Sequence, residues 1–141
     1  MRLIDPETIP QVALDFVNQD HREEALRLNE LVEAVEALRA GRTGPEPVVA
    51  RFEALFDHTR DHFGREDQVM REHGFPAYPV HHGEHERVLE ELAAEGRNFG
   101  ETCDAERLRL YLTVTVPAWF VNHIQSMDRV TAQFVAGRLR G

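Results

Sequence analysis

Three short segments rich in glycine and proline divide the chain into four long stretches with helical periodicity. These breaks are residues 40–45, 74–79 and 96–100. We predict helices over residues 15–39, 45–72, 79–95 and 104–138. In each stretch the apolar residues recur at three- and four-residue spacing, which places them on one helical face. Short connections between long helices favour an antiparallel up-down four-helix bundle, so the predicted fold class is all-α.

We expect residues 1–141 to form a single domain, the usual arrangement for a chain of this length. Residues 1–14 are predicted to be an N-terminal arm, and residues 15–138 the bundle. Pro117 lies inside the fourth predicted helix, which should kink or restart there. The β-branched run at 112–116 could form a strand, but no second strand is predicted to pair with it, so we favour a helix.

Composition excludes several classes of function. The net charge is −9, and all 16 basic residues are arginine. Without a basic stripe, nucleic acids and anionic membranes are not expected partners. The absence of lysine excludes phosphate-loop and Schiff-base lysine chemistry. Ser126 and Cys103 are the only serine and the only cysteine, which argues against a serine hydrolase and an internal disulfide. The acidic N-terminus lacks a signal-peptide pattern, so a cytoplasmic location is expected.

Polar residues of metal-binding type lie on the predicted apolar faces of all four helices. They are His21, His62, Glu66, His81, His85, His123 and Asp128. Residues four apart on a helix have Cβ atoms about 5–6 Å apart, so a pair at this spacing can bind one metal or two adjacent ones. Asp128 follows His123 by five residues, so its carboxylate should reach a different side of the cluster. Imidazole binds transition metals and carboxylates can bridge two of them, so we predict a metal site in the core.

Simpler interpretations explain less of this pattern. A single histidine on an apolar face is usually a hydrogen-bonded core residue, but seven converging groups without core arginines are not accounted for in this way. Ferritin-like sites need Glu three residues before His, which no histidine here has. Residues 81–85 match the zinc-protease pattern H-x-x-E-H, but five of the predicted ligands would then be unexplained. We therefore predict that Glu84 faces solvent and that His73 and His82 are not ligands. His58, four residues before His62, could support a ligand from behind, but we favour a partly exposed histidine.

The order and spacing of these residues resemble the hemerythrin family, and its single-domain bacterial members in particular. Flanking residues add to the resemblance, namely Asn18, Gln19, Asp20, Phe63, Met70, Gly74, Phe75, Pro76, Trp119 and Ile124. The resemblance covers nearly the whole chain. It implies a four-helix bundle with two non-haem iron ions joined by an oxo or hydroxo bridge.

The resemblance also implies a role for each residue. His81, His85 and His123 would bind one iron, His21 and His62 the other, and Glu66 and Asp128 would bridge the two. The second iron would keep an open position for dioxygen or another small diatomic ligand. The expected pocket residues are Phe63, Trp119, Phe120 and Ile124, although core packing alone would explain their presence. Phe120 stands where the family often has a smaller aliphatic residue, and Thr131 where it often has tyrosine.

The function implied is non-enzymatic oxygen binding, as a carrier, a store or a local supplier. One alternative is a sensor of oxygen, nitric oxide or redox state that acts through a separate partner protein, since no signalling segment is recognisable. Another is a peroxidase or a nitric oxide-reducing di-iron enzyme, for which we find no dedicated acid–base residue. A structural bundle without metal would leave the buried ligand-type residues unexplained.

Overall fold

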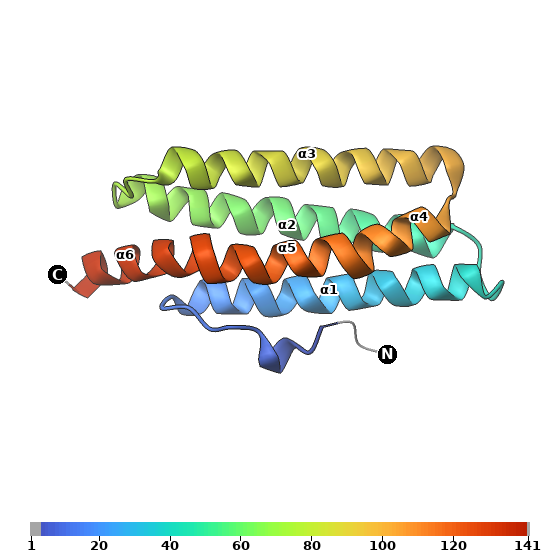
Figure 1. The fold of residues 1–141 in the computed structure, drawn as a ribbon, viewed down its shortest axis with the longest axis horizontal. Helices are drawn as coiled ribbons and strands as arrows, with labels where there is room; N and C mark the ends of the chain where they lie inside the picture. Colours follow the sequence, from blue (N-terminus) through green and yellow to red (C-terminus); the bar gives the residue numbers. More distant parts are fainter. Residues whose placement is uncertain (1–3, 141) are drawn as a thin grey trace.

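The computed structural model describes residues 4–140, which form an antiparallel bundle of four long rods (Figure 1). The first three rods are single helices: α1 (Asp15–Arg39), α2 (Glu46–Glu72) and α3 (Tyr78–Thr102). The fourth rod is continuous and consists of α4 (Ala105–Leu110), η2 (Tyr111–Thr115), α5 (Val116–His123), η3 (Ile124–Asp128) and α6 (Arg129–Arg140). No strand occurs within residues 4–140, so the all-α prediction is confirmed.

The helix ends follow from local chemistry. Gly41 follows α1 with a φ of 73°, a conformation that glycine adopts without steric cost. Asp104 caps α4, because its carboxylate accepts a hydrogen bond of 3.0 Å from the backbone N–H of Arg107. Gly41 agrees with the predicted end of the first helix, and Asp104 agrees with the predicted start of the fourth.

The predicted end of the third helix is wrong, because α3 continues through residues 96–100 and ends at Thr102. Gly96 lies inside this helix because the ring of Phe52 packs too closely there for a larger residue. A Cβ atom added there would lie 2.7 Å from Cε1 of Phe52 on α2. Phe99 is buried against the same core, which holds the extra turn in place. The helix then stops at Cys103, whose φ is 53°.

Two π-helical turns interrupt the fourth rod. In η2 the backbone N–H of Val116 bonds to the carbonyl of Tyr111, five residues earlier, and Pro117 follows in the first turn of α5. Thr115, the residue before α5, has helical backbone angles (φ −68°, ψ −51°), so the rod does not restart at Pro117. The second turn, η3, advances the helical phase. Val130 follows Met127 by three residues and Ile124 by six, and we expected it on the apolar face of the fourth helix. It is instead 47% exposed, and Ala132 and Val135 face the core.

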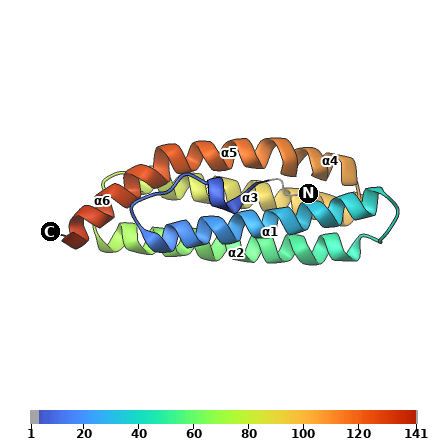
Figure 2. The same cartoon turned by 90° about the horizontal axis from the view of Figure 1, so that it is seen from below.

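The described part of the N-terminal arm lies along α1 (Figure 2). The side chain of Asn29 on α1 accepts a hydrogen bond of 3.0 Å from the N–H of Ile4 and donates one of 2.8 Å to its carbonyl. Ile9 is buried against Phe120 and Ile124, so the arm covers the seam between α1 and the fourth rod. None of the helices in the described chain has both the length and the apolar character needed to span a membrane.

Candidate metal centre

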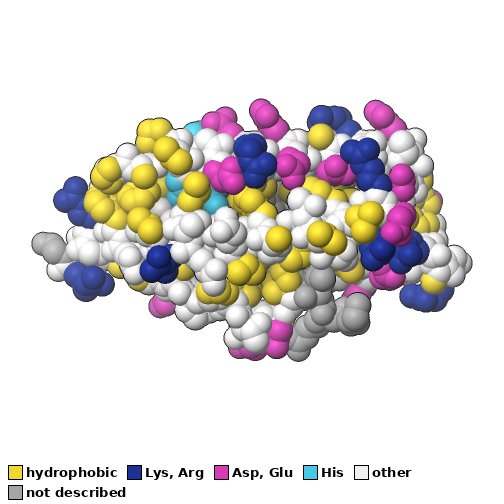
Figure 3. Space-filling view, in the orientation of Figure 1, with side chains coloured by type: hydrophobic (Ala, Val, Ile, Leu, Met, Phe, Trp, Pro, Cys, Tyr) yellow, Lys and Arg dark blue, Asp and Glu magenta, His cyan; other side chains and the backbone are white. Residues whose placement is uncertain are grey.

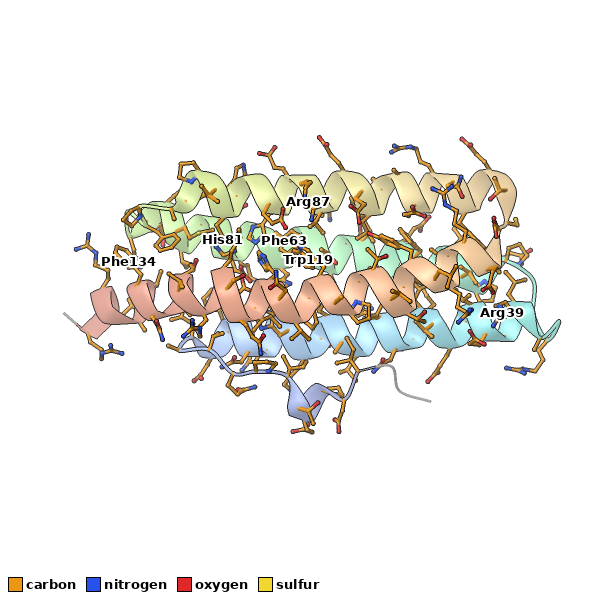
Figure 4. All side chains as sticks on the ribbon, viewed as in Figure 1. Arg39, Phe63, His81, Arg87, Trp119 and Phe134 are labelled. Atoms are coloured by element: carbon orange, nitrogen blue, oxygen red, sulfur yellow. The ribbon has the colours of Figure 1, made fainter. Side chains whose placement is uncertain are left out.

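The structure brings the seven predicted ligand residues together inside the bundle. Each is at most 3% exposed. They are His21 on α1, His62 and Glu66 on α2, His81 and His85 on α3, His123 at the end of α5, and Asp128 at the end of η3. Apolar clusters pack on both sides of them along the bundle axis, so the seven groups lie in one buried region that four helices enclose. The labelled His81, Phe63 and Trp119 mark this region in Figure 4.

The donor atoms form two groups that share Glu66. One contains Glu66, His81, His85, His123 and Asp128, and the other contains His21, His62 and Glu66. Within each group the donor atoms lie within 4.8 Å of one another. The grouping matches the division of histidines that the resemblance implies, three on one side and two on the other.

The two carboxylates span the groups. Glu66 places Oε2 at 2.6 Å from Nε2 of His62, and Oε1 at 3.5 Å from Nε2 of His85. Asp128 places Oδ2 at 2.8 Å from Nε2 of His21, and Oδ1 at 3.1 Å from Nε2 of His123. Each carboxylate thus offers one oxygen to each group, which is the arrangement needed to bridge two metal ions.

The buried atoms at the centre are short of hydrogen-bond partners. Glu66 Oε1, Asp128 Oδ1 and His85 Nε2 lie near other donor atoms of the cluster, but none of the three makes a well-oriented hydrogen bond among the described residues. His81 and His123 place their Nε2 atoms 3.2 Å apart. Two adjacent donors that each bind a transition metal at about 2.0–2.2 Å are themselves about 3 Å apart. The donor set and its spacing therefore fit metal ions better than they fit a hydrogen-bonded core.

Without metal, the buried carboxylates of the cluster need positive charge from the neighbouring imidazoles. Burial opposes the ionisation of Asp128, but hydrogen bonds from surrounding imidazoles hold the pKa of its carboxyl well below the usual value. Burial also disfavours the charged form of His62, yet the carboxylates of Glu66 and Glu24 raise its pKa well above the usual value. Protons on imidazoles therefore compensate the buried carboxylates when no cation does.

Three further residues contact the outer Nδ1 atoms of the predicted ligands. Glu24 Oε1 lies 3.3 Å from Nδ1 of His62, and Asp67 Oδ1 lies 2.9 Å from Nδ1 of His85. Thr131 Oγ1 lies 2.7 Å from Nδ1 of His81. Sequence reasoning did not identify Glu24 or Asp67 as part of the site. Their acidic type on largely buried positions was the available signal, but acidic residues are frequent in this chain.

The other histidines lie outside the two groups. His58 is half-buried, and its Nε2–H donates to the carbonyl of Asp20 at 3.1 Å. His82 is also half-buried and contacts Asp67. His73 follows the end of α2. Figure 3 accordingly shows only small areas of histidine, beside α3, on a face covered mainly by charged and apolar side chains.

A cavity of about 120 Å³ adjoins the donor groups. Its lining includes His62, His123 and the predicted pocket residues Phe63, Trp119 and Phe120. The fourth predicted pocket residue, Ile124, does not line it and packs instead against the arm and α1.

Trp119, which lines this cavity, belongs to a polar network that sequence reasoning missed. The indole Nε1–H of Trp119 donates a hydrogen bond of 2.7 Å to Oε2 of Glu84, and the indole stacks on His123. Arg87 also donates to Glu84, at 2.6 Å. The prediction that Glu84 faces solvent is therefore wrong, because its carboxylate accepts hydrogen bonds from Trp119 and Arg87. The zinc-protease pattern gains no support, since Glu84 is engaged by Trp119 and Arg87.

Comparisons with known proteins agree with this geometry. The family model described as "Hemerythrin HHE cation binding domain" matches residues 12–135. A bacteriohemerythrin of Aquifex aeolicus is 27% identical over 131 residues, which cover 93% of this chain and 96% of that protein. A bacteriohemerythrin of Ralstonia nicotianae is 33% identical over 90 residues, or 64% of each chain. The crystal structure of a hemerythrin point mutant superposes with a TM-score of 0.77 at 20% identity, covering 96% of this chain and 99% of that one.

The matched residues 12–135 include all seven of the clustered residues, the whole of α1, α2 and α3, and the fourth rod as far as residue 135. At 20% identity, the hemerythrin crystal structure shows only that the fold is shared. The match to the Aquifex aeolicus protein extends over 93% of this chain. This protein is a member of the hemerythrin family.

Proposed function

We propose that this protein is a non-haem di-iron protein that binds dioxygen reversibly, as a carrier, a store or a local supplier. The observation that carries the proposal is the unequal pair of donor groups, three histidines against two, joined by two buried carboxylates. His81, His85 and His123 would hold one iron, and His21 and His62 the other. Glu66 and Asp128 would bridge them.

The inequality leaves room for an external ligand on one side. Octahedral iron has six positions. His81, His85 and His123 would hold one ion with three imidazoles, together with Glu66 and Asp128. The ion held by His21 and His62 would have one imidazole fewer, which would leave it able to bind an external ligand. The cavity beside His62 and Phe120 supplies space for a small molecule there.

The residues of this site have separate tasks. Bound ferrous iron supplies the electrons and the Lewis acidity that dioxygen binding needs. The buried carboxylates balance part of the positive charge and hold the two ions at a fixed separation. Phe63, Trp119 and Phe120 make the cavity apolar, which admits a small neutral ligand and disfavours water. Exclusion of water and protons slows the release of reduced oxygen products.

The relatives support the proposal by name and no further, since the matched proteins are called bacteriohemerythrins. Binding as a carrier and binding as a sensor need the same site, so the choice between them is part of the proposal.

The test begins with iron content and then adds oxygen. Purified protein reconstituted with ferrous iron without air should hold two irons per chain. Stopped-flow mixing with dioxygen should produce a charge-transfer band in the visible spectrum that disappears when oxygen is removed. Irreversible oxidation without such a band would contradict reversible binding. Steady consumption of hydrogen peroxide or nitric oxide well above that of free iron would favour an enzyme instead.

A further inference from the structure

Each donor group has a carboxylate behind it that is not a predicted ligand. Glu24 on α1 lies 3.3 Å from Nδ1 of His62, and Asp67 on α2 lies 2.9 Å from Nδ1 of His85. In both rings the other nitrogen, Nε2, faces Glu66 at the centre, at 2.6 Å for His62 and 3.5 Å for His85. The outer carboxylate therefore lies on the side of the imidazole opposite to the metal donors.

A second histidine lies beyond each of these carboxylates. His58 Nε2 is 3.5 Å from Oε1 of Glu24, and His82 Nδ1 is 2.9 Å from Oδ2 of Asp67. Each outer carboxylate therefore contacts a predicted ligand and a second, half-buried histidine, although the Nε2–H of His58 donates its hydrogen bond to the carbonyl of Asp20. The repetition of this arrangement on two helix pairs, α1 with α2 and α2 with α3, is not explained by core packing, which would be served by apolar residues.

Both carboxylates are held in place and largely shielded from solvent. The hydroxyl of Thr59 donates a hydrogen bond of 2.6 Å to Oε2 of Glu24, so the other oxygen, Oε1, faces His62 and His58. Asp67 uses one oxygen for His85 and the other for His82. The side chain of Glu24 is 15% exposed and that of Asp67 is 10% exposed. The ion pairs of both carboxylates within the described residues are with histidines, which are His58 and His62 for Glu24 and His82 and His85 for Asp67.

A carboxylate in this position has a defined effect on a metal-binding imidazole. It accepts the Nδ1–H hydrogen bond, which fixes the tautomer so that the Nε2 lone pair points to the metal. Its negative charge also makes the imidazole a stronger donor, which favours the more oxidised metal. We propose that Glu24 and Asp67 are positioning residues, one for each donor group, that set the orientation and donor strength of His62 and His85.

The two positions are not equivalent in consequence. Glu24 acts on the group with two histidines, next to the cavity, so it influences the ion that is left with an open position. Asp67 acts on the group with three histidines, so it influences the ion that is fully coordinated by the protein and the bridges. The inference rests on the iron site of the proposed function, but it does not depend on reversible oxygen binding.

The experiment uses Glu24→Gln and Asp67→Asn in the full chain. Each change keeps the size of the side chain and an acceptor oxygen, and removes the charge. Glu23→Gln and Asp57→Asn are matched controls, because they make the same changes at exposed positions on the same two helices. The readouts are the rate of iron transfer to a chelator, the Mössbauer spectrum of the diferric protein, and the midpoint potential.

We expect Glu24→Gln and Asp67→Asn to weaken iron retention about 10- to 100-fold, whereas the controls match the unmodified protein. Each variant should alter a different one of the two iron signals in the Mössbauer spectrum, and both should shift the potential to more positive values. A merely structural role would disturb both iron signals together or neither. Thr59→Val, which removes only the hydroxyl that holds Glu24, should alter the same signal as Glu24→Gln, but less.

The outcomes separate this inference from the proposed function. If the unmodified protein holds two irons and the two variants behave like their controls, the positioning role is overturned and the di-iron proposal stands. If both variants alter both signals equally, the assignment of one carboxylate to each group is overturned. If the unmodified protein binds no iron, both proposals fail together.

Discussion

Nε2 of His123 lies 3.1 Å from Oδ1 of Asp128, although five residues separate the two along the fourth rod. In a regular α-helix, residues five apart point about 140° away from each other around the axis. The π-helical turn η3 removes this divergence, because the N–H of Arg129 bonds to the carbonyl of Ile124, five residues back. Turns of this kind recur at functional sites, and here the turn returns the carboxylate to the side of the imidazole.

Replacement of Asp128 tests whether this relationship serves metal binding. Asp128→Asn keeps the size of the side chain but removes the charge that faces His21, His81 and His123. We expect iron content to fall below two per chain, with a loss of affinity greater than the roughly 10- to 100-fold typical of residues behind the ligands. Metal analysis after gel filtration would measure it. Retention of two irons by the variant would contradict a bridging role.

The pH dependence of the metal-free protein follows from the buried histidines. Burial disfavours the charged form of His85, but Asp67 and Glu66 raise its pKa to about 9. Its pKa in the unfolded chain is about 6.5. Because the folded-state pKa is the higher one, the stabilisation is complete below about pH 6.5 and is lost as the pH rises through about 9. The midpoint temperature of thermal unfolding of the metal-free protein should therefore decrease as the pH is raised from about 6.5 to about 9.

Iron-loaded protein is the control for this pH effect. A metal-bound imidazole has already given up its proton, so the loaded protein should show little change in midpoint over the same range. Addition of iron near pH 7 should release protons, which a weakly buffered solution with an indicator dye would detect. A metal-free midpoint that stays constant across this range would show that the histidines do not carry the predicted protons.

The only tryptophan of the chain should report on metal binding. The ring of Trp119 stacks on His123 with centroids 4.5 Å apart and planes 18° from parallel. An iron ion on His123 would be close enough to quench the excited indole. We expect strong emission from metal-free protein, loss of most of it on loading, and recovery with a chelator. Emission that ignores iron would place the metal away from His123.

Two glycines of α3 offer a test of packing that is independent of metal. Gly96→Ala places a methyl group against the ring of Phe52 and should destabilise the protein by about 1–3 kcal/mol. Gly100 has open space around its Cα, so Gly100→Ala should stabilise the helix by about 0.5–1 kcal/mol. Urea unfolding of both variants would measure the free energies. Equal effects at the two positions would contradict the close contact at Gly96.

The helical pattern and the choice of donor residues could be read from the sequence because both are local properties. Periodic apolar residues mark the buried face of a helix. Imidazoles and carboxylates on such a face are unfavourable unless another group compensates the cost of their desolvation. The start and end of α1 followed from the same patterns. The prediction of a break at residues 96–100 was wrong, because Gly96 makes room for the ring of Phe52 on another helix and does not mark a helix end.

The sequence alone therefore determined an all-α chain with an unusual set of polar groups on its apolar faces. Tertiary structure decided the features that depend on residues distant in the chain. It places Glu24 behind His62 and Asp67 behind His85, turns Glu84 toward Trp119, and leaves Val130 exposed to solvent. The physical reason is that spacing along a helix specifies which face a residue occupies, whereas its partner is specified by which other helix packs against that face.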